Sequence, residues 1–214
     1  METDQPRPKG KRDPSATKER LLRAGLAEFG QRGFGGARTA SIAESADCNI
    51  RMLYHYFGDK EGLYLACLER VYSEIRSEEQ RLQLGRLEPV EAVRRLVEFT
   101  YDHMRNHPDF VKMATVENTE RGRFISRLPQ LAAAAEDLVV TIGEILERGA
   151  RCGQLREGID PFQLYVSILS LSYLHLSNRY TLSVTYGRDL GDGVWLERRR
   201  QHVIDLVLAY VVKG

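Results

Sequence analysis

The sequence has 214 residues, of which 43% are hydrophobic, and a formal net charge of +1 at pH 7, values typical of a globular protein with a sizeable core. The N-terminus lacks the apolar segment of a signal peptide, and no run approaches the ~20 apolar residues of a membrane-spanning helix, so we expect a cytoplasmic protein with no membrane partner. The three cysteines show neither CxxC nor Cys/His spacing, which argues against a disulfide framework or a zinc site.

Positive charge is concentrated near the N-terminus. Residues 1–60 contain 11 Lys and Arg against 8 Asp and Glu, a balance of about +3. We expect residues 1–14 to form a flexible basic arm, which suits contact with phosphates, although a solvated tail has the same composition. Six cations are concentrated in residues 7–20, namely Arg7, Lys9, Lys11, Arg12, Lys18 and Arg20, and we assign Lys9, Lys11 and Arg12 to phosphate contact.

The first predicted elements are one long and two short helices. Apolar residues at Leu22, Leu26 and Phe29 predict an amphipathic helix from about residue 15 to Gly33. After a Gly-rich break, TASIAESA predicts a short helix that Thr39 can cap, and DCN supplies a turn. The segment IRMLYHYF predicts a second short helix, and residues 59–85 predict a long one.

The remaining chain is predicted to be helical throughout. Helical patterns cover residues 88–107, 108–122, 131–152, 161–182 and 194–213, and no pair of strands with a hairpin turn is visible. We therefore predict an all-α fold of about nine helices. The expected organisation is a small domain of three helices at 15–60, a connecting helix at 61–84, and a larger helical domain at 85–214.

The last two predicted helices are apolar over most of their circumference, as expected of helices covered on several sides. They suit either the core of one domain or half of a four-helix bundle that a second copy of the chain completes. We favour a homodimer through residues 161–182 and 194–213.

Two short helices joined by a tight turn and braced by a longer helix are the geometry of a helix-turn-helix, whose second helix enters the major groove of DNA. Leu53 and Phe57 are spaced to pack inward. The opposite surface of this second short helix then carries the candidates for base reading. Arginine can form two hydrogen bonds to guanine, other polar groups can bond to base edges, and an aliphatic residue can contact the thymine methyl group. These candidates are Asn49, Ile50, Arg51, Tyr54 and His55.

Residues from about 17 to 64 resemble the N-terminal domain of TetR-family transcriptional regulators over nearly its whole length. The most specific run comprises Leu53, Tyr54, Tyr56, Phe57, Lys60 and Glu61. The resemblance implies that Thr39, Tyr56 and Lys60 bind phosphates, that Tyr54 and His55 lie at the groove, and that residues 49–52 read bases. Three positions depart from the family pattern. Arg51 stands where the family commonly has a small residue or proline. Asp47 stands where it often has glycine, and Asn49 where it often has serine.

Within residues 85–214, the stretches NHPDFVKMATVENTERG and YLHLSNRYTLSVTYGRDL are similar to the C-terminal domain of the RutR-like branch of this family. This weaker resemblance implies that residues 85–214 form a ligand-binding and dimerisation domain, which dimerises through its last two long helices. Polar groups in otherwise apolar helices are candidates for the ligand pocket, and hydrogen-bonded core or interface residues are the alternative. They are Tyr101, Glu117, Asn118, Tyr173, His175 and Asn178.

His103 and His107 are four residues apart and have the spacing to bind a metal on one helix face. Without a third ligand in view, we favour a solvated pair and expect no metal and no cofactor other than an unidentified small-molecule effector.

The preferred function is a sequence-specific transcriptional repressor that a small molecule releases from a palindromic operator. One alternative is a ligand-independent regulator that acts through partner contacts, and another is a helical carrier or enzyme. No catalytic motif is present, so we expect no enzyme. A cavity of about a few hundred Å³ bordered by Asn118 and Asn178 would distinguish the ligand-responsive regulator from the ligand-independent one.

Overall fold

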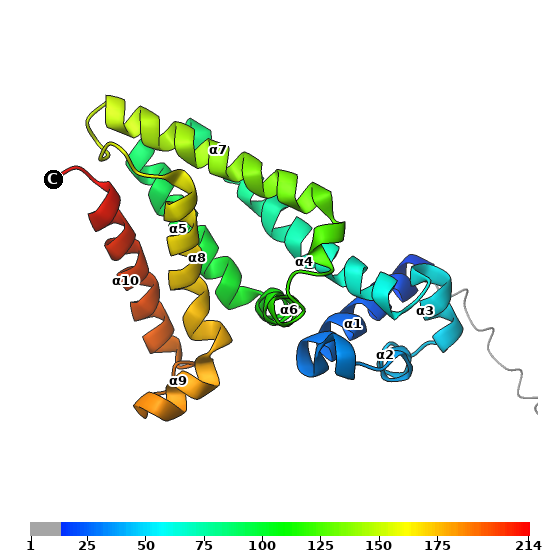
Figure 1. Cartoon of the computed structure of the whole chain (residues 1–214). Coiled ribbons are helices and arrows are strands. Elements are labelled where there is room, and N and C mark those ends of the chain that lie inside the picture. The colour runs from blue at the N-terminus through cyan, green and yellow to red at the C-terminus, as the bar shows by residue number, and fades with distance from the viewer. Residues whose placement is uncertain (1–13) are drawn as a thin grey trace, which may run out of the picture. The chain divides into compact units, whose positions relative to one another are not determined.

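The computed structural model describes residues 14–214, which contain ten α-helices and two short 3-10 helices (Figure 1). The prediction of an all-α fold is therefore confirmed. The residues Lys9, Lys11 and Arg12 lie outside the described part. The helices are α1 (Pro14–Gly36), α2 (Thr39–Ser45), α3 (Ile50–Phe57), α4 (Lys60–Arg81), η1 (Leu84–Arg86), α5 (Pro89–Asn106), α6 (Pro108–Thr119), η2 (Ile125–Arg127), α7 (Pro129–Arg151), α8 (Pro161–Ser177), α9 (Arg179–Tyr186) and α10 (Gly193–Val211).

The chain divides into two compact units within α4, between Cys67 and Leu68. The division falls inside the predicted connecting helix, residues 61–84. We call the parts before and after it the N-terminal unit and the C-terminal unit. Among residues 14–214, no helix is long and apolar enough to cross a membrane.

The N-terminal unit consists of α1, α2, α3 and the start of α4 around a small apolar core. The fully buried side chains of this core are Leu21, Phe29, Ile42, Leu53, Leu63 and Tyr64. A Cβ atom on Gly25 would lie 3.0 Å from the Cys67 sulfur, so glycine lets α1 pack closely against α4. The backbone of α1 leaves helical geometry at Gly33, where φ is 67°, so its regular part ends where the sequence predicted.

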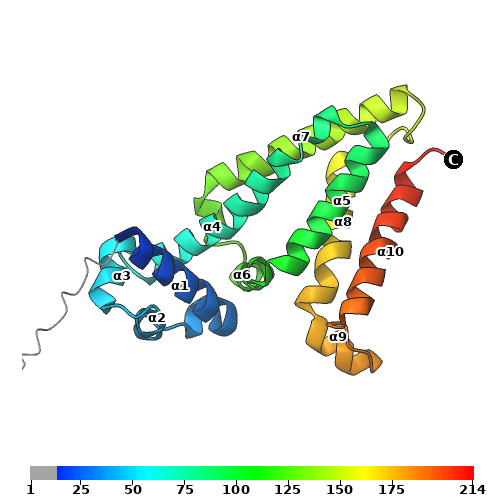
Figure 2. The same ribbon diagram turned by 180° about the vertical axis from the view of Figure 1, so that it is seen from behind.

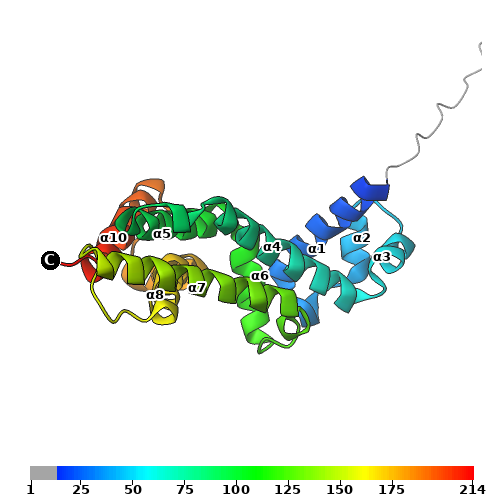
Figure 3. The ribbon, with the colours of Figure 1, turned by 90° about the horizontal axis from the view of Figure 1, so that it is seen from above.

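The C-terminal unit is built around α5, which packs against α7, α8 and α10 (Figures 2 and 3). The buried side chains that these four helices share are aliphatic for the most part, as the helical spacing of the sequence predicts. They include Val93, Leu96, Val97, Ile142, Ile145, Ile168, Val203, Ile204 and Val207.

The predicted helix at 161–182 is two helices, and this is why the described residues hold ten helices and not nine. The break falls at Asn178, whose side-chain amide donates to the carbonyl oxygen of Leu174 at 3.2 Å and to the Ser177 hydroxyl at 2.9 Å. Asparagine competes with the backbone for such hydrogen bonds, which explains why α8 ends there and α9 begins.

Candidate nucleic-acid interface

The start of α3 is held in place by its own capping residue. Asn49 precedes the helix, and its side-chain oxygen accepts a hydrogen bond from the backbone N–H of Arg51 at 2.9 Å. In the turn before it, Asp47 adopts a left-handed conformation with φ of 46°. Glycine enters this region without a steric cost, so glycine would suit this backbone at least as well as aspartate. The side-chain oxygen of Asn49 thus caps the helix, and in the described part of the chain its NH2 group makes no hydrogen bond that competes with this role.

The two faces of α3 differ in chemistry. Leu53 is fully buried, whereas Arg51, Tyr54 and His55 are exposed, with 46% of Tyr54 accessible. Ile50 is half-buried. One helix therefore anchors itself in the apolar core and presents a cation, a phenol and an imidazole outward, which are groups able to donate hydrogen bonds to base edges and phosphates.

The residues expected at phosphates lie around this helix. Thr39 is the first residue of α2, and Arg38 is its N-cap without a side-chain capping bond, so the expected capping role of Thr39 is wrong. Its hydroxyl shares a hydrogen bond of 3.3 Å with the hydroxyl of Tyr54 instead. The Lys60 ammonium lies 4.8 Å from the centroid of the Phe34 ring and 3.5 Å from the Gly35 carbonyl oxygen. These contacts orient the ammonium.

Tyr56 is half-buried, and its ring centroid lies 5.2 Å from that of His55. The ring that carries the Tyr56 hydroxyl is thus in contact with the neighbouring imidazole ring.

Arg20 has a role that the sequence did not reveal. Its Nε atom donates to the carbonyl oxygen of Ala46 at 3.0 Å, and its guanidinium also donates to the Thr17 hydroxyl at 3.1 Å. Ala46 is the last residue before the turn, so Arg20 ties α1 to the junction of α2 and α3. In sequence it is one cation among several near the N-terminus, and only the folded backbone distinguishes it.

In the C-terminal unit, the structure brings together two of the predicted ligand residues. The rings of Tyr101 on α5 and His175 on α8 stack with centroids 5.3 Å apart, and Trp195 on α10 lies 5.6 Å from His175. The Tyr101 hydroxyl donates to the Leu196 carbonyl oxygen at 2.7 Å. Burial raises the pKa of Tyr101 to about 12. Burial and, to a smaller extent, the charge of Arg199 together lower the pKa of His175 to about 4.

Several buried polar atoms near His175 have no hydrogen-bond partner among the described residues. They are both ring nitrogens of His175, the hydroxyl oxygen of Ser172 one turn before it, and Nε of Arg199. Arg199 also donates through Nη2 to the Leu171 carbonyl oxygen at 3.2 Å, which places its guanidinium beside α8. Buried polar groups are normally satisfied, so this cluster has the capacity to bind a further polar molecule.

The other predicted pocket residues do not join this cluster. The Tyr173 hydroxyl pairs with that of Thr115 at 2.6 Å. The carboxylate of Glu117 is buried and accepts from the backbone N–H groups of Phe124 and Ile125, so it stabilises the turn after α6.

Asn118 and Asn178 are both exposed and donate to carbonyl oxygens of their own helices. Cavities of about 560, 360 and 240 Å³ occur in the C-terminal unit, and none of these three is lined by a predicted pocket residue. The cavity expected beside the two asparagines is therefore not among them, so the test set for a ligand-responsive regulator is not met at that position.

A buried charged network in the C-terminal unit also escaped prediction. Glu79 on α4 accepts from Arg76 at 2.6 Å and from the Tyr165 hydroxyl on α8 at 3.0 Å, and Arg76 also donates to Tyr165 at 3.1 Å. Burial raises the pKa of Glu79, and the Arg76 cation and the hydrogen bond from Tyr165 oppose that shift. The network connects α4 to α8.

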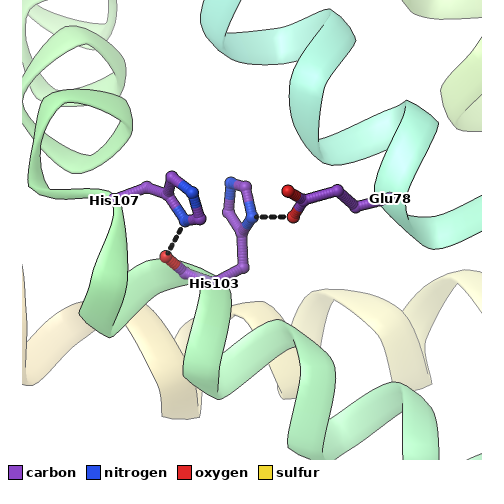
Figure 4. A group of neighbouring side chains, drawn as sticks. All are labelled: Glu78, His103 and His107. Carbon is purple, nitrogen blue, oxygen red and sulfur yellow. Dashed lines mark hydrogen bonds and ion pairs between the residues drawn. The ribbon is translucent and has the colours of Figure 1, made fainter.

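The histidine pair of α5 differs from its prediction. His103 is only 3% exposed, and Glu78 of α4 supplies an acidic neighbour whose carboxylate lies 2.9 Å from Nδ1 of His103 (Figure 4). Burial lowers the pKa of His103, an effect that the hydrogen bond to Glu78 opposes. The interpretation of His103 and His107 as a solvated pair is therefore wrong, because His103 is buried. Glu78 lies on another helix, so the spacing of residues in the sequence could not associate it with this pair.

Comparison with known families and proteins covers both units. Residues 21–67 match the family model described as "Bacterial regulatory proteins, tetR family", and residues 89–207 match that described as "Tetracyclin repressor-like, C-terminal domain". The chain is similar to the HTH-type transcriptional repressor NicS of Pseudomonas putida, with 36% identity over 82% of this chain and 83% of NicS. It is more distantly similar to the HTH-type transcriptional regulator RutR of Escherichia coli, with 24% identity over 94% and 92% of the two chains.

Solved structures share the fold at low identity. The ketosteroid transcriptional regulator KstR2 of Mycobacterium tuberculosis superposes with a TM-score of 0.72 at 18% identity, covering 92% of this chain and 95% of that one. The regulator PfmR of Thermus thermophilus superposes with a TM-score of 0.68 at 19% identity, covering 89% and 98%. The helical architecture is thus shared even where few residues are identical.

Proposed function

The chain belongs to the TetR family of DNA-binding bacterial transcription regulators, which are not enzymes, and from that membership we propose that it is a homodimeric repressor released from a palindromic operator by a small molecule. A protein with this role acts in the cytoplasm, where bacterial DNA lies. Repression is favoured over activation because NicS, the relative with 36% identity, is described as a repressor.

The observation that carries the proposal is the two-faced α3. Its inner residue Leu53 has no exposed surface, while Arg51, Tyr54 and His55 are exposed on a backbone that the Asn49 cap and the Arg20 brace hold in place. A helix placed in the major groove reads sequence through such outward polar side chains. We assign base reading to Asn49, Ile50, Arg51, Tyr54 and His55, and phosphate binding to Thr39, Tyr56, Lys60 and the basic arm with Lys9, Lys11 and Arg12.

Unpartnered apolar surface supports the homodimer. Large hydrophobic side chains are exposed along α8, α9 and α10, and a groove of about 240 Å³ lies between α8 and α10. Contiguous apolar surface on a single chain marks an interaction site. A two-fold dimer through these helices would provide two copies of α3 for half-sites about 34–36 Å apart on DNA. The exposed residues are Phe162, Val166, Leu174, Tyr180, Val184, Tyr186, Val194, Leu206 and Tyr210.

We place the effector beside His175. The unpartnered nitrogens of His175, the Ser172 hydroxyl and the Arg199 Nε supply donors and acceptors, and the Tyr101 and Trp195 rings supply apolar walls. A few converging polar groups among aromatic side chains are the usual composition of a small-molecule site. The effector is therefore expected to be a small molecule with hydrogen-bonding groups and a flat or apolar part.

Release follows if the effector prefers a conformation that is unsuited to the operator. A differential affinity of about 1–3 kcal/mol between two conformations changes DNA occupancy about 5–150-fold. The helix α4 runs from Lys60, a proposed phosphate ligand, to Arg76 and Glu79 of the buried network, so the two units share one helix.

The decisive experiment is selection of DNA. The purified full-length protein is mixed with fragmented genomic DNA, and the retained fragments are sequenced. Enrichment of sites with two inverted half-sites whose centres are one helical turn apart supports the proposal, and the neighbouring genes indicate the effector class. Retention without any shared sequence would refute sequence-specific repression.

A further inference from the structure

Glu78, His103 and His107 each bring one potential ligand atom to within 4.8 Å of those of the other two. His107 is the residue that ends α5, one helical turn after His103, so both imidazoles lie on the same side of the helix. Figure 4 shows the two rings side by side, with centroids 4.0 Å apart and planes inclined by 20°. We propose that these three residues form a binding site for a divalent transition-metal cation, with the two imidazoles as ligands and Glu78 as the group that orients His103.

The hydrogen bonds of both rings leave the same nitrogen available. Nδ1 of His103 lies 2.9 Å from a Glu78 carboxylate oxygen, and Nδ1 of His107 lies 3.0 Å from the backbone carbonyl oxygen of His103 (Figure 4). A carboxylate and a carbonyl can only accept, so each Nδ1 of the neutral rings carries the hydrogen and each Nε2 keeps a lone pair. Histidine ligands of metals are oriented in this way, by donating their other N–H to a carboxylate or a carbonyl.

Nε2 of His103 is buried and has no hydrogen-bond partner within residues 14–214. A purely structural Glu–His pair accounts for Nδ1 of this ring and leaves Nε2 unsatisfied, which is unfavourable for a buried polar atom. A cation bound between the two Nε2 atoms satisfies it.

The surroundings suit a cation and give it access. The His103 side chain is 1% exposed, but the Glu78 side chain is 31% exposed and His107 is half-buried, so the site is open to solvent on one side. The charge of Glu74, one turn before Glu78 on α4, also acts on His103. Two carboxylates thus add negative charge beside the imidazoles. Imidazole ligands favour Zn²⁺, Co²⁺, Ni²⁺ or Cu²⁺ over Mg²⁺ or Ca²⁺.

An apolar wall limits movement of the buried ring. The rings of Phe99 and Phe110 each have their centroid 5.6 Å from that of His103. Packing and the hydrogen bond to Glu78 therefore fix His103, and such fixed ligands bind metals more tightly than mobile ones. The site joins α4 to the end of α5, and both helices belong to the C-terminal unit at this point.

The test uses untagged full-length protein freed of metal by a chelator. Calorimetric titration with Zn²⁺ is expected to show one strong site per chain, and Mg²⁺ none. His107→Ala removes a half-buried ligand and is expected to weaken Zn²⁺ binding by more than about 10-fold, while Glu78→Gln weakens it about 10–100-fold through loss of the orienting carboxylate. His202→Ala is the matched control, because His202 is an exposed histidine on α10 and its loss should change nothing.

Zn²⁺ binding that is equally strong in wild type and in both the His107→Ala and Glu78→Gln variants would overturn the proposal, as would a strong site lost on His202→Ala. Circular dichroism of each variant establishes that it is folded, and His107→Ala is preferred to a change at the buried His103 for that reason. The measured quantity is metal affinity and not DNA binding. The result therefore tests this site independently of the proposed repressor function.

Discussion

Replacing Arg51 by alanine is expected to weaken operator binding and relax its sequence preference. Arg51 is exposed, its backbone N–H is bound by Asn49, and Leu53 two residues later is fully buried, so the side chain projects from a fixed backbone. A bidentate arginine–guanine pair contributes about 1–3 kcal/mol of discrimination. A homodimer carries two copies, so the total loss is about 2–6 kcal/mol, or roughly 30-fold to more than 10⁴-fold in affinity.

The assay is fluorescence anisotropy with a selected operator and with operators changed at one base pair per half-site. Arg51→Ala should bind the original and the changed operator about equally at the position that Arg51 reads. Lys60→Ala is the control, because Lys60 is assigned to phosphate: it should weaken all sequences alike and reduce the salt slope by about 2 for the dimer. An Arg51→Ala protein that keeps full discrimination at every position would refute the assignment of this residue to base reading.

Three further predictions concern the C-terminal unit. Glu79→Leu should lower the free energy of unfolding in urea by about 3–5 kcal/mol, because it leaves the Arg76 cation buried and unpaired, and a loss below about 1 kcal/mol would contradict this. Burial lowers the pKa of His175 from 6.5 to about 4, so the unfolded chain binds more protons between these values, and stability should fall by up to about 3 kcal/mol as pH decreases from 6.5 to 4. His175→Phe should remove that part of the pH dependence in urea titrations, and equal pH slopes for the two proteins would show the reasoning to be wrong. Phe162→Asp should raise the dissociation constant of the dimer about 30-fold in sedimentation experiments, because about 2 kcal/mol of apolar burial is lost over the two copies. Val140→Asp is the control. Val140 lies on α7 and is equally exposed, at 57%, so its replacement should leave the dissociation constant unchanged.

The sequence by itself determined most of the helices and the exposed face of α3. Helical spacing of apolar residues is a local property, so the repeat of period 3.6 identified the elements, and Gly33 and Gly58 marked where two of them end. The exposure of Arg51, Tyr54 and His55 followed from the same periodicity, because Leu53 fixes which side of α3 faces the core. The break at Asn178 was missed because the apolar pattern continues through it and only a side-chain hydrogen bond marks the end of α8.

Only the tertiary structure decided which polar side chains meet. Glu79 and Tyr165 are 86 residues apart in sequence, and Glu78 and His103 are 25 apart, yet each pair forms a hydrogen bond. The periodicity of a sequence indicates on which face of its own helix a side chain lies. It does not indicate which helix packs against that face, or which residues of that helix lie opposite. The contacts that α4 makes with α5 and α8 in the folded chain decide which polar side chains meet. The fold brought Glu78 to a histidine pair that otherwise resembled a solvated one, and it left Asn178 at the surface, away from the ligand site predicted for it.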